Sequence, residues 1–161
     1  MNTKQFIIEQ MQMVRGMLNE WVNDIPEDKM TVRAIDGGVH LAWILSHLAW
    51  SEAGTINKFI REQPNPMRRL GKACGMGSTV VDDAGAYPSK SEALANLEKV
   101  RAETLSFLQT LSEDDLDKLV KGGPPEFKTW GSIFALIASH EAHHGGQISV
   151  IWRRLGHKPR I

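Results

Sequence analysis

The stretch TWGSIFALIASHEAHHGGQISVIWRRL, residues 129–155, carries apolar residues at steps of three and four. At about 100° per residue, that spacing gathers them within an arc of roughly 80° on one face of a helix. Thr129 is a residue type that caps helix N-termini, and Gly156, with Pro159 beyond it, is typical of a helix end. The stretch therefore predicts one long amphipathic helix, whose apolar face needs other helices to cover it.

Two long segments upstream have the same period. The first predicts a helix over residues 3–23, which ends before Pro26. The second begins near Asp36, a suitable N-cap, and continues to about Arg61, ahead of Pro64. Because this second segment is apolar over much of its circumference, we expect it to be the central helix of the fold.

The rest of the chain completes a helical pattern. Ser89 and Glu92 form a capping box that begins a third long helix, and a short helical piece is expected over residues 112–120. Residues 62–88 are rich in glycine and proline and keep no period, so we expect a long loop that covers a site as a lid. There is no strand signal longer than a few residues. We predict a single all-α domain over residues 1–161, a four-helix bundle with one extra short helix and a long loop between the second and third helices.

The composition argues against several functional classes. The chain has 161 residues, and 19 Lys and Arg balance 19 Asp and Glu, so its formal net charge is zero. Because nucleic-acid binding needs a basic excess, we expect no nucleic-acid partner. No apolar run approaches the ~18 residues of a membrane helix, and the single cysteine cannot form an intrachain disulfide. We therefore expect a cytoplasmic protein that does not enter the membrane.

His140 and His144 lie inside the apolar stripe of the last helix. Two imidazoles at positions i and i+4 are about 6 Å apart along the helix axis, so both can reach one metal ion. Buried imidazoles without a metal would leave several donors and acceptors unsatisfied in an apolar space. The pair therefore predicts a metal site that faces the core.

Two further histidines, His40 and His47, lie on one side of the second helix. Either could be a third ligand, but their separation of roughly 10 Å along the axis is too large for both to bind one ion. His143 lies about 80° from the centre of the apolar stripe, so we expect it on the flank of the last helix. His157 follows the helix end and is expected to be exposed.

The segment His140-Glu-Ala-His-His144 also matches the H-E-x-x-H pattern, in which two histidines bind zinc and the glutamate is the general base of a metallopeptidase. Two features count against a peptidase. Residues 145–161 contain no Asp or Glu that could be a third ligand. Gln147 and Val150 stand where a metzincin has glycine and histidine. A metallopeptidase is therefore the least favoured alternative.

Four stretches of the chain form a set: Ser46-His-Leu-Ala-Trp-Ser-Glu52, Trp130-Gly-Ser-Ile133, His140-Glu-Ala-His-His-Gly-Gly-Gln147 and Arg154-Leu-Gly-His-Lys-Pro159. Together they resemble the DinB-like (YfiT-like) family, and the similarity covers essentially the whole chain. The resemblance implies a four-helix bundle, commonly homodimeric, that holds one divalent metal through three histidines. Carried over to this chain, these are His47, His140 and His144, which favours His47 over His40. Characterised branches of the family are similar to S-transferases or isomerases that use low-molecular-weight thiols such as bacillithiol or mycothiol.

Three protein ligands with an open fourth position are the catalytic arrangement for zinc. Imidazole suits zinc, nickel and iron alike, so the ligands do not identify the metal. We expect Glu52, Glu141 or Gln147 to orient the imidazoles through their second nitrogens. The resulting expectation is a metal-dependent enzyme, a small-thiol S-transferase or a hydrolase, that acts on a small electrophile. The alternative is a non-catalytic homodimer that binds a metal or another ligand.

Two positions bear on how far the resemblance extends. The family typically has arginine where this chain has Gly145, and two adjacent glycines within a helix cost about 1 kcal/mol each relative to alanine. We expect close helix packing at Gly145, with the alternative that the missing arginine changes space or charge near the site. Cys74, in the long loop, has no basic neighbour closer than Lys72 and is expected to be an inert thiol.

Overall fold

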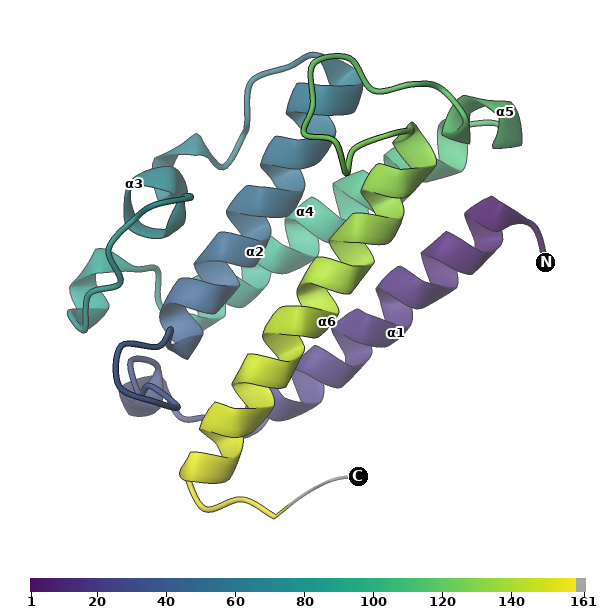
Figure 1. The fold of residues 1–161 in the computed structure, drawn as a ribbon. Helices are drawn as coiled ribbons and strands as arrows, with labels where there is room; N and C mark the ends of the chain where they lie inside the picture. Colours follow the sequence, from purple (N-terminus) through teal and green to yellow (C-terminus); the bar gives the residue numbers. More distant parts are fainter. Residues whose placement is uncertain (159–161) are drawn as a thin grey trace.

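Four long helices form most of the molecule (Figure 1). The computed structural model describes residues 1–158, so the stop signal at Pro159 lies outside the described residues. The long helices are α1 (Thr3–Asp24), α2 (Leu41–Ile56), α4 (Lys90–Thr110) and α6 (Trp130–Arg154). Two short helices, α3 (Gly71–Cys74) and α5 (Glu113–Leu116), lie in the connections. Residues 1–158 contain two isolated β-bridges and no strand, so the predicted all-α class is confirmed.

Side-chain caps explain where most of these helices begin. Capping boxes start α5 at Ser112 and α6 at Thr129. The Thr129 cap was predicted, and α5 begins where the short helical piece over residues 112–120 was expected but ends at Leu116. Ser89 caps α4 by accepting a hydrogen bond from the Glu92 N–H, so the capping box expected there is half formed. The caps bind backbone N–H groups that have no partner within the helix.

The start of α2 corrects the prediction. Its N-cap is His40 and not Asp36, because the His40 Nδ1 accepts a hydrogen bond from the Trp43 N–H at 3.2 Å. Gly37 adopts a φ of 74° in a turn before the helix, and this left-handed conformation interrupts any helix that begins at Asp36. At its other end α2 continues into a π-helical turn, Asn57–Arg61, so the predicted helix end is right.

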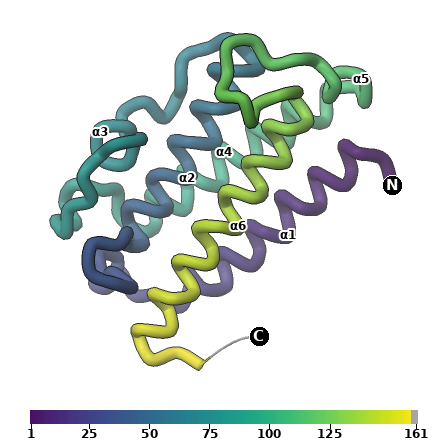
Figure 2. Tube along the Cα trace, viewed as in Figure 1, coloured from purple at the N-terminus to yellow at the C-terminus, as the bar shows by residue number. Residues whose placement is uncertain are grey.

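The four long helices form two parallel pairs. Lys4 near the start of α1 donates to the carbonyl of Leu111 after α4, and Lys90 at the start of α4 donates to the carbonyl of Ile25 after α1. These two helices are therefore antiparallel. Figure 2 shows that α6 runs beside α1 in the same direction, and that α2 and α4 also run in the same direction as each other.

This topology explains the long connection between α2 and α4. Both helices end at the same end of the bundle, so the chain must return along the length of α2 before α4 can begin (Figure 1). The connection contains two 3-10 turns, Arg68–Leu70 and Ala84–Ala86, and the single helical turn α3. The bundle therefore has two short helices where one was predicted. Periodicity does not detect a helix as short as α3, because four residues barely complete one turn.

Two apolar clusters fill the bundle, one toward each end. The first is built around Leu18, Leu45, Leu97 and Ile151, and the second around Met11, Ile60, Leu108 and Phe134. Between the clusters, at the middle of the bundle, the long helices contribute buried polar side chains. No helix among residues 1–158 has the length and apolar character to cross a bilayer.

Candidate metal centre

Three histidines from two helices meet at the middle of the bundle. His47 comes from α2, and His140 and His144 come from successive turns of α6. The Nε2 atom of His140 lies 3.3 Å from that of His47 and 3.1 Å from that of His144. One nitrogen from each ring lies within 4.8 Å of the other two, so the three could hold one metal ion.

Hydrogen bonds at the opposite nitrogens fix two of the rings. The Nδ1 of His47 donates to the backbone carbonyl of Cys74 at 2.8 Å, since a carbonyl can only accept. The Nδ1 of His144 donates to Oε1 of Gln147 at 2.7 Å. Because Nδ1 carries the proton in the neutral rings of His47 and His144, the Nε2 atom of each has a lone pair, and both lone pairs point toward His140.

This arrangement fits a metal ion better than it fits hydrogen bonding. The two lone pairs on His47 and His144 face the single Nε2 of His140, which has at most one proton to donate. One lone pair is therefore left without a donor. Two nitrogen ligands about 2.0–2.1 Å from an ion lie about 2.8–3.4 Å apart at octahedral or tetrahedral angles. The observed separations of 3.3 and 3.1 Å fall in this interval.

Burial keeps the three imidazoles neutral. Burial, together with the neighbouring imidazoles of His47 and His143, lowers the pKa of His140 to about 4. Burial likewise lowers the pKa of His144 to about 4, with His140 as the next cause. The pKa of His47 is also lowered by burial, although its bond to the Cys74 carbonyl opposes the shift. Neutral imidazole is the form that binds metal.

The long connection supports the site from outside the bundle. Besides the Cys74 carbonyl, it supplies Ser78, whose hydroxyl accepts a hydrogen bond from Trp43 Nε1 at 3.2 Å. The Trp43 ring stacks on His47, with centroids 4.5 Å apart and planes 11° from parallel. The Cys74 thiol itself donates to the carbonyl of Leu70, and burial raises its pKa to about 12. Such a thiol is unreactive, as expected.

A cleft of about 980 Å³ opens beside the histidines. His47 and His140 form part of its wall, together with apolar side chains and two loops. Met76 belongs to the long connection, which therefore forms one side of the cleft. Residues 122–124 and Phe127, between α5 and α6, form another side. A small molecule in this cleft would lie next to two of the three imidazoles.

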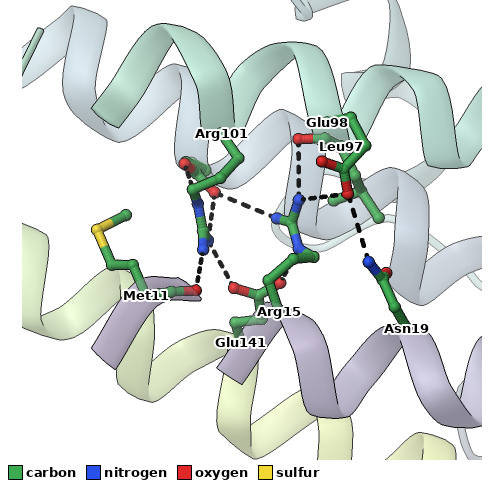
Figure 3. Close-up of polar contacts among 8 residues, drawn as sticks. Met11, Arg15, Asn19, Leu97, Glu98, Arg101 and Glu141 are labelled. Carbon is green, nitrogen blue, oxygen red and sulfur yellow. Dashed lines mark hydrogen bonds and ion pairs between the residues drawn. The ribbon is translucent and has the colours of Figure 1, made fainter. Parts of the chain in front are cut away.

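Glu52 and Glu141 have a different role from the one expected. They bind Arg15 and Arg101 in a buried cluster to which each long helix contributes one residue (Figure 3). Arg101 donates to both carboxylate oxygens of Glu52, at 3.0 and 2.9 Å, and also to Glu141. Burial alone would lower the pKa of Arg101, but these bonds raise it above its usual value.

The cluster changes the interpretation of the H-E-x-x-H pattern. Glu141 is 1% exposed, and its two carboxylate oxygens accept hydrogen bonds from Arg15 and Arg101. It is therefore not available as the general base of a metallopeptidase. The hydrogen bonds of Glu52 and Glu141 among residues 1–158 go to the arginines, so of the three expected orienting residues only Gln147 contacts an imidazole.

The other histidines lie outside the cluster of three. His40 is fully buried as the N-cap of α2, and its Nε2 donates to the carbonyl of Val81 at 2.8 Å. His143 is exposed on the flank of α6, as expected. His157 stacks on Trp152 with ring centroids 4.7 Å apart and is half-buried, which corrects the expectation of an exposed tail.

Gly145 lies where α6 packs on α1. A Cβ at this position would stand 3.4 Å from Cζ3 of Trp21, so a longer side chain would have to displace or pass that ring. The expected close helix packing is present. The missing arginine therefore opens no space beside the three histidines, which lie between α6 and α2.

Several contributors to the site were not predicted. The carbonyl of Cys74 has no sequence signal, because every residue has one. Arg15 and Arg101 each lie within an apolar stripe, Arg15 four residues after Met11 and Arg101 four after Leu97, and that position signals a buried charge. The glycine and proline residues at 122–124 indicate a turn but not that it borders a cleft.

Comparison with known proteins agrees with this fold. A family model of the DinB superfamily matches residues 10–148. YfiT from Bacillus subtilis, described as a probable metal-dependent hydrolase with an unusual four-helix bundle topology, is 21% identical with a TM-score of 0.67, and the match covers 96% of this chain and 89% of YfiT. An uncharacterised protein from Escherichia coli UTI89 is 16% identical with a TM-score of 0.70, over 99% of this chain and 98% of that one. No curated protein matches the sequence.

Proposed function

This chain belongs to the DinB superfamily, and on that premise we propose that it is a metal-dependent enzyme that acts on a small molecule in the cleft. We propose His47, His140 and His144 as the ligands of one divalent ion, which would be zinc, nickel or iron. One observation carries the proposal: the Nε2 atoms of three histidines converge where the cleft reaches the middle of the bundle, and at least one lone pair there has no hydrogen-bond donor.

When bound, such an ion would lower the pKa of a coordinated water or thiol, so that hydroxide or thiolate forms near neutral pH. The chain's own groups prepare the site for that chemistry. The Cys74 carbonyl and the Gln147 side chain hold two imidazoles with Nε2 unprotonated. The apolar surfaces of Trp50 and Phe127 border the cleft and are suited to hold the body of a substrate away from water.

Two nucleophiles are candidates. A low-molecular-weight thiol is implied by the sequence resemblance, and it would make the protein an S-transferase: the sulfur bonds to an electrophilic carbon, and the leaving group departs with its electron pair. Water is favoured by the structural similarity to YfiT, which is described as a probable metal-dependent hydrolase. We propose the thiol reaction as the first candidate and hydrolysis as the second.

An activity panel on the metal-loaded protein separates these reactions. The electrophile is 1-chloro-2,4-dinitrobenzene. If the protein is an S-transferase, its metal-loaded form consumes bacillithiol or mycothiol faster than its metal-free form does. A hydrolase instead cleaves p-nitrophenyl esters without added thiol. Full metal occupancy with neither activity would favour the alternative, a homodimer that binds a metal or another ligand without catalysis.

We also propose a homodimer, as the resemblance implies. The support in this chain is a set of exposed apolar side chains on the neighbouring helices α1 and α6. Phe6, Met13 and Met17 are 51%, 52% and 42% exposed on one side of α1. Leu136 and Val150 are 37% and 50% exposed on α6. A second copy of the chain would cover these side chains and remove them from water.

A further inference from the structure

The cleft beside the histidines has an uneven distribution of charge. Aromatic and apolar side chains border it, among them Trp50, Phe59, Met76 and Phe127, together with neutral polar side chains. Its single charged side chain is that of Lys58, and neither Asp nor Glu lines it among residues 1–158. A cleft of this composition favours a molecule that combines an apolar body with a negative charge.

Lys58, in the π-helical turn that continues α2, lies on the same helix face as His47. His47, Ser51, Gly54 and Lys58 follow one another at steps of four, three and four, and all four line the cleft. At 1.5 Å per residue, the positions of His47 and Lys58 are about 16 Å apart along the axis. The lysine side chain can shorten this span by several ångströms, which leaves a length typical of a small organic molecule.

The backbone at Lys58 departs from regular helix. Asn57–Arg61 form a π-helical turn, and the next residue, Glu62, adopts a left-handed conformation with a φ of 53°. π-turns are rare and occur frequently at functional sites, and a left-handed conformation is unfavourable for residues other than glycine. The turn directs both Lys58 and Phe59 to the wall of the cleft.

The Lys58 ammonium is available to a ligand. Its Nζ lies 4.9 Å from the centroid of the Phe59 ring and forms no ion pair with any residue between 1 and 158. On its other side Lys58 borders a smaller hollow together with Lys118, Lys121 and Glu62. Of these, Lys118 is paired with Asp115. The Lys58 ammonium at this end of the cleft therefore forms no ion pair with a carboxylate of residues 1–158.

Building on the proposed function, we infer that the cleft takes a small organic acid with an apolar or aromatic body. Its acid group would lie at the Lys58 ammonium, and its body would lie against Trp50 and Phe127. The opposite end of the molecule would then face His47 and His140, where the proposed reaction takes place. A carboxylate and a sulfonate share this chemistry, because both present oxygens that accept hydrogen bonds from an ammonium group.

Two matched fluorescent probes test this inference without any enzyme activity. The probe 8-anilinonaphthalene-1-sulfonate carries a negative charge, whereas N-phenyl-1-naphthylamine has the same aromatic body without it. We expect Lys58→Met to weaken binding of the sulfonate about three- to fivefold, the upper part of the range of an exposed ion pair, and to leave binding of the neutral probe unchanged. Trp50→Ala should weaken both probes, because both share the aromatic body.

The control variant is Lys99→Met, which removes the same charge from an exposed position on α4. It should leave both dissociation constants unchanged, and circular dichroism checks that every variant is folded. The inference is overturned if Lys58→Met leaves the ratio of the two dissociation constants unaltered, or if Lys99→Met alters it equally. Probe binding does not require metal, so the two proposals can fail separately. If the protein binds no metal but still prefers the charged probe through Lys58, the proposed function is refuted and the inference about the cleft stands.

Discussion

Adjacent residues of α6 serve two separate structures. The imidazole of His140 meets His47 and His144 beside the cleft, whereas the carboxylate of Glu141 is enclosed by Arg15 and Arg101 on the α1 and α4 side (Figure 3). Both arginine partners are nearly as buried as Glu141, with 5% and 4% of their surface exposed. Removing one charge from such a cluster leaves another buried and uncompensated, which is costly.

We predict that Glu141→Gln lowers the free energy of unfolding by about 3–5 kcal/mol, the usual effect of breaking a buried ion pair. Urea denaturation measures this change. The control is Glu98→Gln: Glu98 is 59% exposed and lies 3.5 Å from Arg15, so its loss should cost less than about 1 kcal/mol. A Glu141→Gln protein that is as stable as wild type but loses a hydrolytic activity would instead indicate a catalytic base.

Single residues also show what the sequence could and could not predict about the site. Helical spacing placed His140 and His144 on one buried face, and it left His40 and His47 as alternatives that the resemblance resolved. The structure brings His47 to the pair and uses His40 as a helix cap. The positions of Arg15 and Arg101 within apolar stripes signal buried charges, but helical spacing does not identify Glu52 and Glu141 as their partners, so this pairing was missed.

The individual helices follow local signals more closely than the site does. The predicted bounds of α1 and α6 and the predicted start of α4 agree with the structure within one or two residues, because caps and apolar stripes are local features. The start of α2 was predicted wrongly, because His40 is not among the residue types that usually cap helices. The short helix α3 and the course of the connection across His47 depend on tertiary contacts, and no local pattern predicts them.

The cap of α2 makes the stability of this helix depend on pH. Neutral His40 accepts from the Trp43 N–H at Nδ1 and donates to the Val81 carbonyl at Nε2, and protonation of Nδ1 would remove the first bond. Burial lowers the pKa of His40 below its usual 6.5, and the nearby Arg33 adds to this. The Val81 carbonyl and Asp82 oppose the shift, and the Tyr87 ring packs edge-on against the imidazole.

The sign of the effect follows from the lowered pKa. Below about pH 6.5 the unfolded chain binds a proton that the folded chain resists, so stability falls as the pH decreases from 6.5 toward the folded-state pKa. His40→Asn retains an N-cap and does not titrate, so its unfolding free energy should depend less on pH than that of wild type. Chemical denaturation at pH 7.5, 6.5 and 5.5 measures the difference. Parallel pH profiles for the two proteins would show that His40 does not titrate in this way.

At the scale of the whole molecule, the bundle has three layers along its length. Apolar clusters occupy the two ends, and the histidines and the charged cluster share the middle. The parallel pairing of α2 with α4 requires a long connection, and that connection supplies both the Cys74 carbonyl and part of the cleft wall. The topology thus links the fold to the site.

The exposed apolar side of α1 and α6 leads to a prediction about assembly. If a second copy covers it, sedimentation equilibrium should give about twice the 18.0 kDa mass of one chain. The double variant Met13→Glu and Met17→Glu places charges on that side of α1 and should give monomers. The matched control Lys99→Glu adds charge elsewhere and should remain dimeric. A wild-type protein that stays monomeric at high concentration would contradict the proposed dimer.

The most direct test of the central claim is the metal content of the purified protein by plasma mass spectrometry, after equilibration with zinc, nickel or iron and removal of excess ion. We predict about one divalent ion per chain in wild type and in His143→Ala, which changes an exposed neighbour of the site. His144→Ala removes a proposed ligand and should bind the same ion more than about 100-fold more weakly, because the loss of an outer hydrogen-bond partner alone costs about 10–100-fold. Equal metal content in His144→Ala and His143→Ala would contradict the account.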